Sequence, residues 1–190
     1  MNTKITFFIA LCCITHVALA KPAQFYKPYK SSILVENIQP KLYLIKDVNV
    51  RLSSKTNSPD FQTEEQIKNR YIQKLNEELK QQNLLANEQT TQPIFVNFDI
   101  EQKRVFAGED LKFLSPKVVG KYAHSTLIYK STLVHNNVEL AKLSSEEKIS
   151  IGKKGSLSKI VRDLSGGGKP ENELEDIDGF AHYMIEQLPQ

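Results

Sequence analysis

The chain has 190 residues, and its 25 lysines and arginines against 22 aspartates and glutamates give a net charge of +3 at pH 7. A charge so close to balance provides no general attraction for nucleic acid, which requires a clustered excess of basic side chains. The length fits one domain, and a domain near this size buries about 70% of its unfolded surface without needing disulfides.

The first twenty residues have the layout of a secretory signal peptide. Lys4 supplies a positive charge, residues 5–17 are mostly apolar, and Ala18-Leu19-Ala20 places small residues where a signal peptidase reads them. The apolar stretch is shorter than the roughly 20 residues of a membrane-spanning helix, and an uncleaved N-terminal anchor is the alternative. We therefore expect residues 1–20 to be cleaved on export, leaving no transmembrane span.

Both cysteines, Cys12 and Cys13, lie inside this signal, so the exported chain has none. Lipidation requires a small residue before the acylated cysteine, and neither Leu11 nor Cys12 meets that requirement for the cysteine that follows it. Small secreted eukaryotic domains usually rely on disulfides, so a cysteine-free exported chain favours a bacterial envelope protein. We expect the protein in the periplasm, without a lipid anchor.

Residues 21–39 are predicted to form an extended N-terminal arm, because Pro22 and Pro28 interrupt regular structure. One interpretation is a poorly ordered segment that leads into the domain. The other is an arm that binds an anionic surface through its basic and aromatic side chains, which are Lys21, Phe25, Tyr26, Lys27, Tyr29 and Lys30.

The domain is predicted to begin with a half-buried strand, because apolar and polar side chains alternate over residues 42–52. Leu44 belongs to the core face in this pattern, and Tyr43 and Asn49 belong to the outer face. Lys46 is the one residue that breaks the pattern.

A helix is predicted to follow. Thr63 and Gln66 have the spacing of a capping box, in which two side chains satisfy free backbone donors at a helix start. The helix is expected to end near Asn83. Apolar side chains recur every fourth residue along it, at Ile67, Tyr71, Leu75 and Leu79.

Three more strands are predicted. Residues 94–101 alternate between the two faces, and residues 122–134 and 138–143 are joined by His135-Asn136-Asn137, where asparagine favours a hairpin turn. The outer face of the first of these strands is predicted to carry Phe95, Asn97, Asp99 and Glu101.

The end of the chain is predicted to be helical. Residues 156–164 suggest a short helix that stops at Gly166-Gly167-Gly168, and a final helix shows one apolar face from Ile177 to Leu188. An acidic cluster at its start complements the helix dipole, and this explains it better than a metal site does. The cluster consists of Glu173, Glu175, Asp176 and Asp178.

Together these elements predict an α+β fold with the order β-α-β-β-β-α in a single domain spanning residues 40–190. A two-layer sandwich, with a mostly antiparallel four-stranded sheet and the helices on one face, would bury both apolar helix stripes.

No cofactor, metal or catalytic motif is recognised in the sequence. The four histidines have no ligand at metal-binding spacing, and the glycine-rich run before Lys169 departs from a phosphate-binding loop at Asp163 and Pro170. Asp99 and Glu101 share a strand face, the arrangement a two-carboxylate hydrolase uses. The histidines are His16, His124, His135 and His182.

The order of elements over residues 40–188, behind an export signal, resembles that of small bacterial envelope proteins. These are the lipopolysaccharide-assembly lipoproteins, the YajG-like lipoproteins and the penicillin-binding-protein activator lipoproteins. The resemblance implies a non-enzymatic accessory role, in which the domain binds an envelope assembly protein. Those families are usually lipid-anchored, and this chain departs from them in lacking a lipidation motif.

The leading hypothesis is therefore an accessory module that works through protein contacts. Two alternatives remain: a secreted hydrolase or enzyme inhibitor that uses Asp99, Glu101 or His124, and a binder of anionic surfaces through the N-terminal arm. Sheet faces, edges and loop tips are where partners attach. The candidate contact residues are Tyr43, Asn49, Phe95 and Asn97 on the outer face, and His135 and Asn136 at the hairpin tip.

Overall fold

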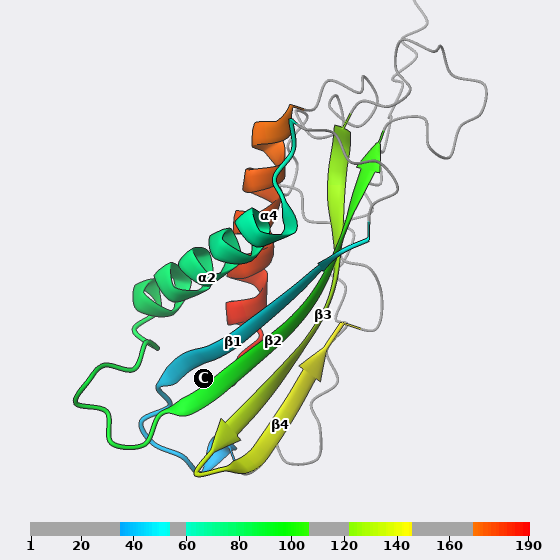
Figure 1. Ribbon diagram of the computed structural model, residues 1–190. Helices are drawn as coiled ribbons and strands as arrows, with labels where there is room; N and C mark the ends of the chain where they lie inside the picture. Colours follow the sequence, from blue (N-terminus) through cyan, green and yellow to red (C-terminus); the bar gives the residue numbers. More distant parts are fainter. Residues whose placement is uncertain (1–34, 54–59, 107–121, 146–168) are drawn as a thin grey trace, which may run out of the picture.

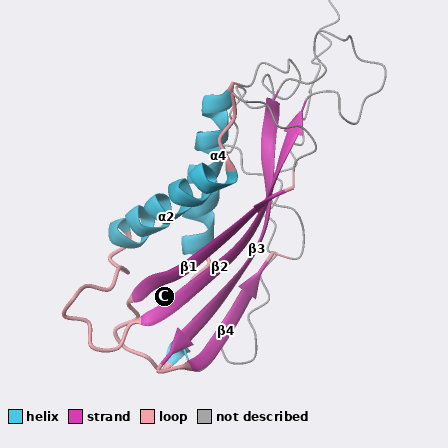
Figure 2. Cartoon of the chain, viewed as in Figure 1, coloured by secondary structure: helices cyan, strands magenta, loops and turns pink. Residues whose placement is uncertain are grey.

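The computed structural model describes residues 35–53, 60–106, 122–145 and 169–190. The α+β class and the four-stranded sheet are confirmed (Figure 1). Both helices pack on the same side of the sheet (Figure 2). In chain order the elements are β1 (Tyr43–Leu52), α2 (Glu64–Gln81), β2 (Ile94–Phe106), β3 (Tyr122–His135), β4 (Val138–Ser144) and α4 (Pro170–Glu186).

The sheet is mixed, so the prediction of a mostly antiparallel sheet was wrong. The strands lie in the order β1-β2-β3-β4, with β1 and β2 parallel and the other two pairs antiparallel. The cause is α2, which carries the chain back along the sheet after β1, so that β2 starts at the same end as β1. β3 and β4 are instead joined directly by the turn at Asn136 and Asn137, so they run antiparallel.

β1 changes face part-way along, at a bulge that the sequence marks with Lys46. Ile45 pairs with Val96 and Asp47 pairs with Asn97, so Lys46 is the extra residue. Side chains before the bulge therefore have the opposite orientation from the prediction, which carried one alternation through the strand.

Two predicted positions are corrected by this bulge. Tyr43 was expected on the outer face, but it is fully buried and its hydroxyl donates a hydrogen bond to the Pro189 carbonyl. Leu44 was expected in the core, but it is 38% exposed. Tyr43 is therefore a core residue and no longer a candidate contact residue.

The helix predictions hold in detail for α2. Its capping box is present: the Gln66 amide donates to Thr63 Oγ1 at 3.2 Å, and the Thr63 amide donates to Gln66 Oε1 at 2.8 Å. The chain leaves the helix at Asn83, whose φ is 57°. All four residues of the predicted apolar stripe are buried, namely Ile67, Tyr71, Leu75 and Leu79.

α4 packs beside α2 and completes the core. It starts at Pro170, so the acidic residues predicted at its start lie within its first turns. Burying a large apolar side chain contributes about 1.5–3 kcal/mol, which makes this stripe a main source of stability. The buried apolar residues of α4 are Ile177, Phe180, Ala181, Met184 and Ile185.

The predicted hairpin is confirmed between β3 and β4. Asn136 and Asn137 have positive φ values of 49° and 62°, the backbone that a tight two-residue hairpin turn requires.

The helices among the described residues are all too short or too polar to cross a membrane. Several predicted segments lie outside the described residues: the signal peptide 1–20, the arm up to residue 34, the short helix 156–164 and the glycine run 166–168.

Candidate functional site

The open face of the sheet, opposite the two helices, carries three of the predicted contact residues. β1 and β2 pass in front of α4 in Figure 1, so that view looks onto this face. Asn49, Phe95 and Asn97 all point outward, because they alternate with buried residues of the same strands. In the parallel pairing of β1 with β2, Phe95 lies opposite Leu44, Asn97 opposite Asp47, and Asn49 opposite Asp99.

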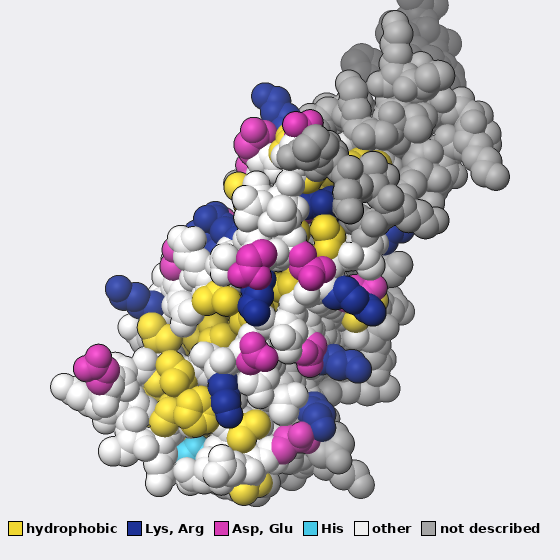
Figure 3. Space-filling model, in the orientation of Figure 1, with side chains coloured by type: hydrophobic (Ala, Val, Ile, Leu, Met, Phe, Trp, Pro, Cys, Tyr) yellow, Lys and Arg dark blue, Asp and Glu magenta, His cyan; other side chains and the backbone are white. Residues whose placement is uncertain are grey.

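An apolar row crosses three strands of the open face near the start of β1. Leu44 pairs with Phe95, and Phe95 pairs with Val134 on β3. Leu44 is exposed, and the other two side chains are half-buried. Figure 3 shows hydrophobic side chains gathered toward the lower left of this view, with charged side chains interspersed farther up.

Lys46 lies beside this row. Its ammonium group is 5.8 Å from the centre of the Phe95 ring, a cation–π contact worth about 0.5–1 kcal/mol at an exposed site. The bulge that corrects the register of β1 therefore also places a positive charge next to the apolar row.

On β1 and β2, the rows that follow along the open face are polar, and side chains contact each other across the two strands. The Asn49 side-chain amide donates to Asp47 and to Asp99, with both donor–acceptor distances at 3.2 Å. Arg51 forms an ion pair with Glu101 on the neighbouring strand. Asp99 and Glu101 thus share a face, as predicted, and each contacts a side chain of β1.

The structure does not bring His124 to these carboxylates. His124 pairs with Val105, four residues beyond Glu101 on β2, which separates them by about 13 Å along the strand. The three residues of the hydrolase hypothesis are therefore spread along the sheet and do not form a single site.

A buried polar cluster between α4 and strands β2 and β3 was missed in the sequence. At its centre Arg104 binds Glu173 through two hydrogen bonds, from Nε to Oε1 at 2.6 Å and from Nη2 to Oε2 at 2.9 Å. Their side chains are 2% and 0% exposed. Arg104 also donates to the Gln62 carbonyl and stacks over Phe61 at 5.0 Å from the ring centre.

Gln102 extends the cluster toward α2. Its side-chain oxygen accepts a hydrogen bond from the Tyr71 hydroxyl at 2.8 Å, and its Nε2 contacts Ser125 Oγ at 3.2 Å and Glu173 Oε1 at 3.3 Å. Burial raises the pKa of Tyr71 well above its ordinary value, and the nearby Glu173 and Asp176 raise it further. Tyr71 therefore keeps its proton and donates a hydrogen bond to Gln102.

Asp176 anchors the other side of the cluster. It accepts hydrogen bonds from the Ser125 amide at 2.8 Å and from the Tyr122 hydroxyl, which lies 3.0 Å from Ser125 Oγ. Burial, followed by the charge of Asp176, raises the pKa of Tyr122 far above its usual range. These groups hold each other in place, and so the cluster serves to fix α4 on the sheet.

The sequence contained a signal for this cluster. The core-facing alternation of β2 continues past Ile100 to Gln102 and Arg104, which places an arginine on a face that otherwise carries apolar side chains. Glu173 and Asp176 likewise lie on the same stripe of α4 as Ile177. Two members of the acidic cluster therefore face inward, which an interaction with the helix dipole does not require.

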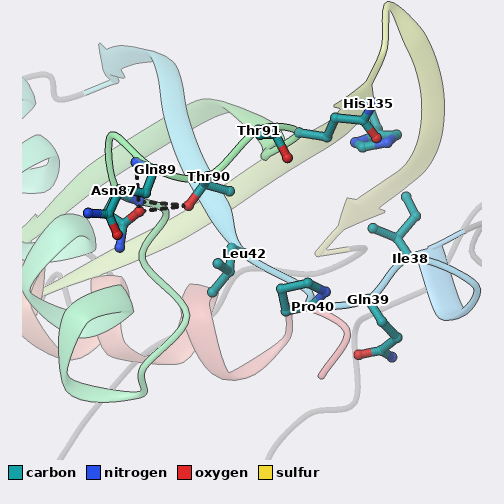
Figure 4. A pocket seen from close by; sticks show the side chains of 10 residues that line it. Ile38, Gln39, Pro40, Leu42, Asn87, Gln89, Thr90, Thr91 and His135 are labelled. Carbon is teal, nitrogen blue, oxygen red and sulfur yellow. Dashed lines mark hydrogen bonds between the residues drawn. The ribbon is translucent and has the colours of Figure 1, made fainter.

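A separate pocket of about 400 Å³ lies at the end of the sheet where β1 begins. The segment before β1, the loop between α2 and β2, and the end of β3 form its walls (Figure 4). His135 lines it, with Nδ1 3.4 Å from the Pro93 carbonyl oxygen. Asn136, the other predicted residue of the hairpin tip, is exposed in the turn and does not line the pocket.

The chain matches no protein-family model and no curated protein. Its function must therefore be inferred from the open face, the buried cluster and the pocket. Among the described residues, no three His, Cys, Asp or Glu side chains are grouped so that they could hold a metal ion.

Proposed function

We propose that this protein is a non-enzymatic accessory protein of the bacterial periplasm that binds another envelope protein through the open face of its sheet. The apolar row Leu44–Phe95–Val134 is the observation that carries this proposal. With both helices packed on the opposite side, the domain forms a two-layer sandwich, and no helix of the described residues covers its second sheet face.

The chemistry of the open face defines the partner it fits. An apolar side chain of the partner would cover Leu44 and Phe95, and a carboxylate beside it would meet Lys46. Interface energy concentrates in such apolar anchors, while surrounding polar contacts exclude water and set the orientation. The polar rows that contain Asn49 and Asn97 supply these surrounding polar contacts.

The test is recovery of the partner by affinity purification of the exported protein from its host's envelope after mild crosslinking. Replacing the apolar row in Leu44→Ser/Phe95→Ser should reduce recovery of one envelope protein about tenfold or more, since each lost anchor costs over 1 kcal/mol. Lys46→Glu should also reduce recovery, because it places a negative charge against the partner's carboxylate.

Lys80→Glu is the matched control, because Lys80 is an exposed basic residue of α2, away from the open face. It should leave recovery unchanged. Thermal unfolding of each variant confirms that the fold is intact. Equal recovery of the same protein with all of these variants would contradict the proposal.

A further inference from the structure

The pocket at the end of the sheet is a second candidate site, independent of the open face. We propose that it binds an uncharged saccharide, preferably one that carries acetamido groups. Its volume of about 400 Å³ lies within the range of roughly 300–1,000 Å³ usual for small-ligand sites. One or two sugar units fit such a space.

The two sides of the pocket differ in chemistry. Ile38, Pro40 and Leu42 lie along one side in Figure 4, and Thr90, Thr91 and His135 lie along the other. An apolar wall opposite a row of hydroxyl and ring nitrogen groups suits a sugar ring. The carbon–hydrogen face of the sugar would pack on the apolar side, and its hydroxyl groups would bind to the polar side.

The amide and hydroxyl side chains of the pocket are neutral. Gln89 and Gln92 supply side-chain amides, each with both a donor and an acceptor, and no Lys, Arg, Asp or Glu lines the described walls. Neither Thr91 nor Gln92 makes a side-chain hydrogen bond to another described residue, so both can exchange bound water for a ligand. An acetamido group, itself a paired donor and acceptor, matches such an amide.

His135 adds a ring nitrogen to the polar side. Its Nδ1 faces the Pro93 carbonyl, which can only accept, so the geometry favours the ring form with the proton on Nδ1. Nε2 is then an acceptor, the group that a sugar hydroxyl donates to.

The walls are held in place before any ligand arrives. In the loop after α2, the Asn87 amide donates to Thr90 Oγ1 at 3.0 Å, and Asn87 Oδ1 accepts from the Gln89 amide at 3.0 Å. The Leu42 carbonyl accepts from the Ile94 amide at 2.8 Å, which ties the apolar side to β2. A pre-formed site lowers the entropy that binding would otherwise cost.

The test is an NMR titration of the ¹⁵N-labelled protein, produced with its own leader and purified after processing. The probes are triacetylchitotriose and maltotriose. The acetylated sugar should shift the backbone amides of residues 38–42, 89–92 and 135, with a dissociation constant on the order of 1 mM. Maltotriose should bind more weakly at the same amides.

The variants make the test specific. Gln89→Ala/Gln92→Ala should weaken binding about fivefold or more, because one hydrogen bond is worth about 1 kcal/mol. His135→Ala should weaken it too. Gln81→Ala, an exposed glutamine of α2 outside the pocket, is the matched control and should bind as the unaltered protein does.

Three outcomes would overturn the proposal. The first is that neither sugar shifts any amide at about 10 mM, which is 10-fold above the expected dissociation constant. The second is that the pocket variants leave the shifts unchanged, and the third is that acetyl-triglycine amide shifts the pocket amides while the sugars do not. None of these results depends on the protein partner of the open face. The two proposals therefore fail separately.

Discussion

The two faces of the sheet use their polar side chains in opposite ways. On the helix-facing side, Arg104 and Glu173 are almost fully buried and bind each other and their neighbours. On the open side, Arg51 pairs with Glu101 while its side chain stays 73% exposed, so water competes for the contact. The buried polar groups stabilise the fold, and the exposed ones can exchange their present contacts for contacts with a bound protein.

The largest expected effect comes from breaking the buried ion pair. Arg104→Met removes the partner of Glu173 and leaves a carboxylate without compensation in the core, which costs about 3–5 kcal/mol. Urea unfolding of the variant measures this loss. Arg104→Met/Glu173→Met removes both charges and should be less destabilised than the single variant; a double variant that is equally unstable would mean that packing dominates.

A smaller loss is expected at the edge of the cluster. Tyr122→Phe removes the hydroxyl that donates to Asp176, while the Ser125 amide continues to bind the same carboxylate. The expected cost is about 1–3 kcal/mol, read from the same unfolding curves. Tyr183→Phe on α4, whose side chain is half-buried outside the cluster, provides the comparison and should lose less stability.

Changes on the open face should affect stability much less than they affect binding. Leu44→Ser removes an exposed side chain, so we expect a loss under about 1 kcal/mol in the free energy of unfolding. Recovery of the partner should nevertheless fall. A loss as large as that of Arg104→Met would show that Leu44 belongs to the core, which would remove the distinction between the two faces.

The smallest effect concerns pH at the surface between α2 and α4. The hydrogen bond to Glu78 raises the pKa of His182 above 6.5, and Glu186 adds to the shift. The protonated ring therefore stabilises the fold below about pH 6.5, and this contribution is lost as pH rises through the raised pKa. His182 is 52% exposed, so the contribution is under about 1 kcal/mol. Melting temperatures of His182→Gln at pH 5.5 and 8.5 should differ less than those of the unaltered protein.

Local patterns predicted the parts of the fold that depend on neighbouring residues. The capping box at Thr63, the α2 stripe and the hairpin turn at Asn136 all arise from contacts between residues close in the chain. The sheet face of Phe95 and Asn97 followed from a regular alternation. These features therefore agree with the structure residue by residue.

The parts that failed depend on distant pairing. Whether β2 runs parallel to β1 is decided by where α2 returns the chain, and no local pattern in either strand records that direction. The bulge at Lys46 is fixed by register against β2, so the faces of Tyr43 and Leu44 were exchanged. Arg104 and Glu173 lie 69 residues apart, so no local pattern in the sequence pairs them.

Photo-crosslinking in the host tests the account most directly. A photoreactive amino acid in place of Phe95 lies within the apolar row, and the same amino acid in place of Lys80 lies on α2. We predict that the position 95 probe crosslinks to one envelope protein and that the position 80 probe does not. Crosslinking of that protein from position 80 alone, or from neither position, would contradict binding through the open face.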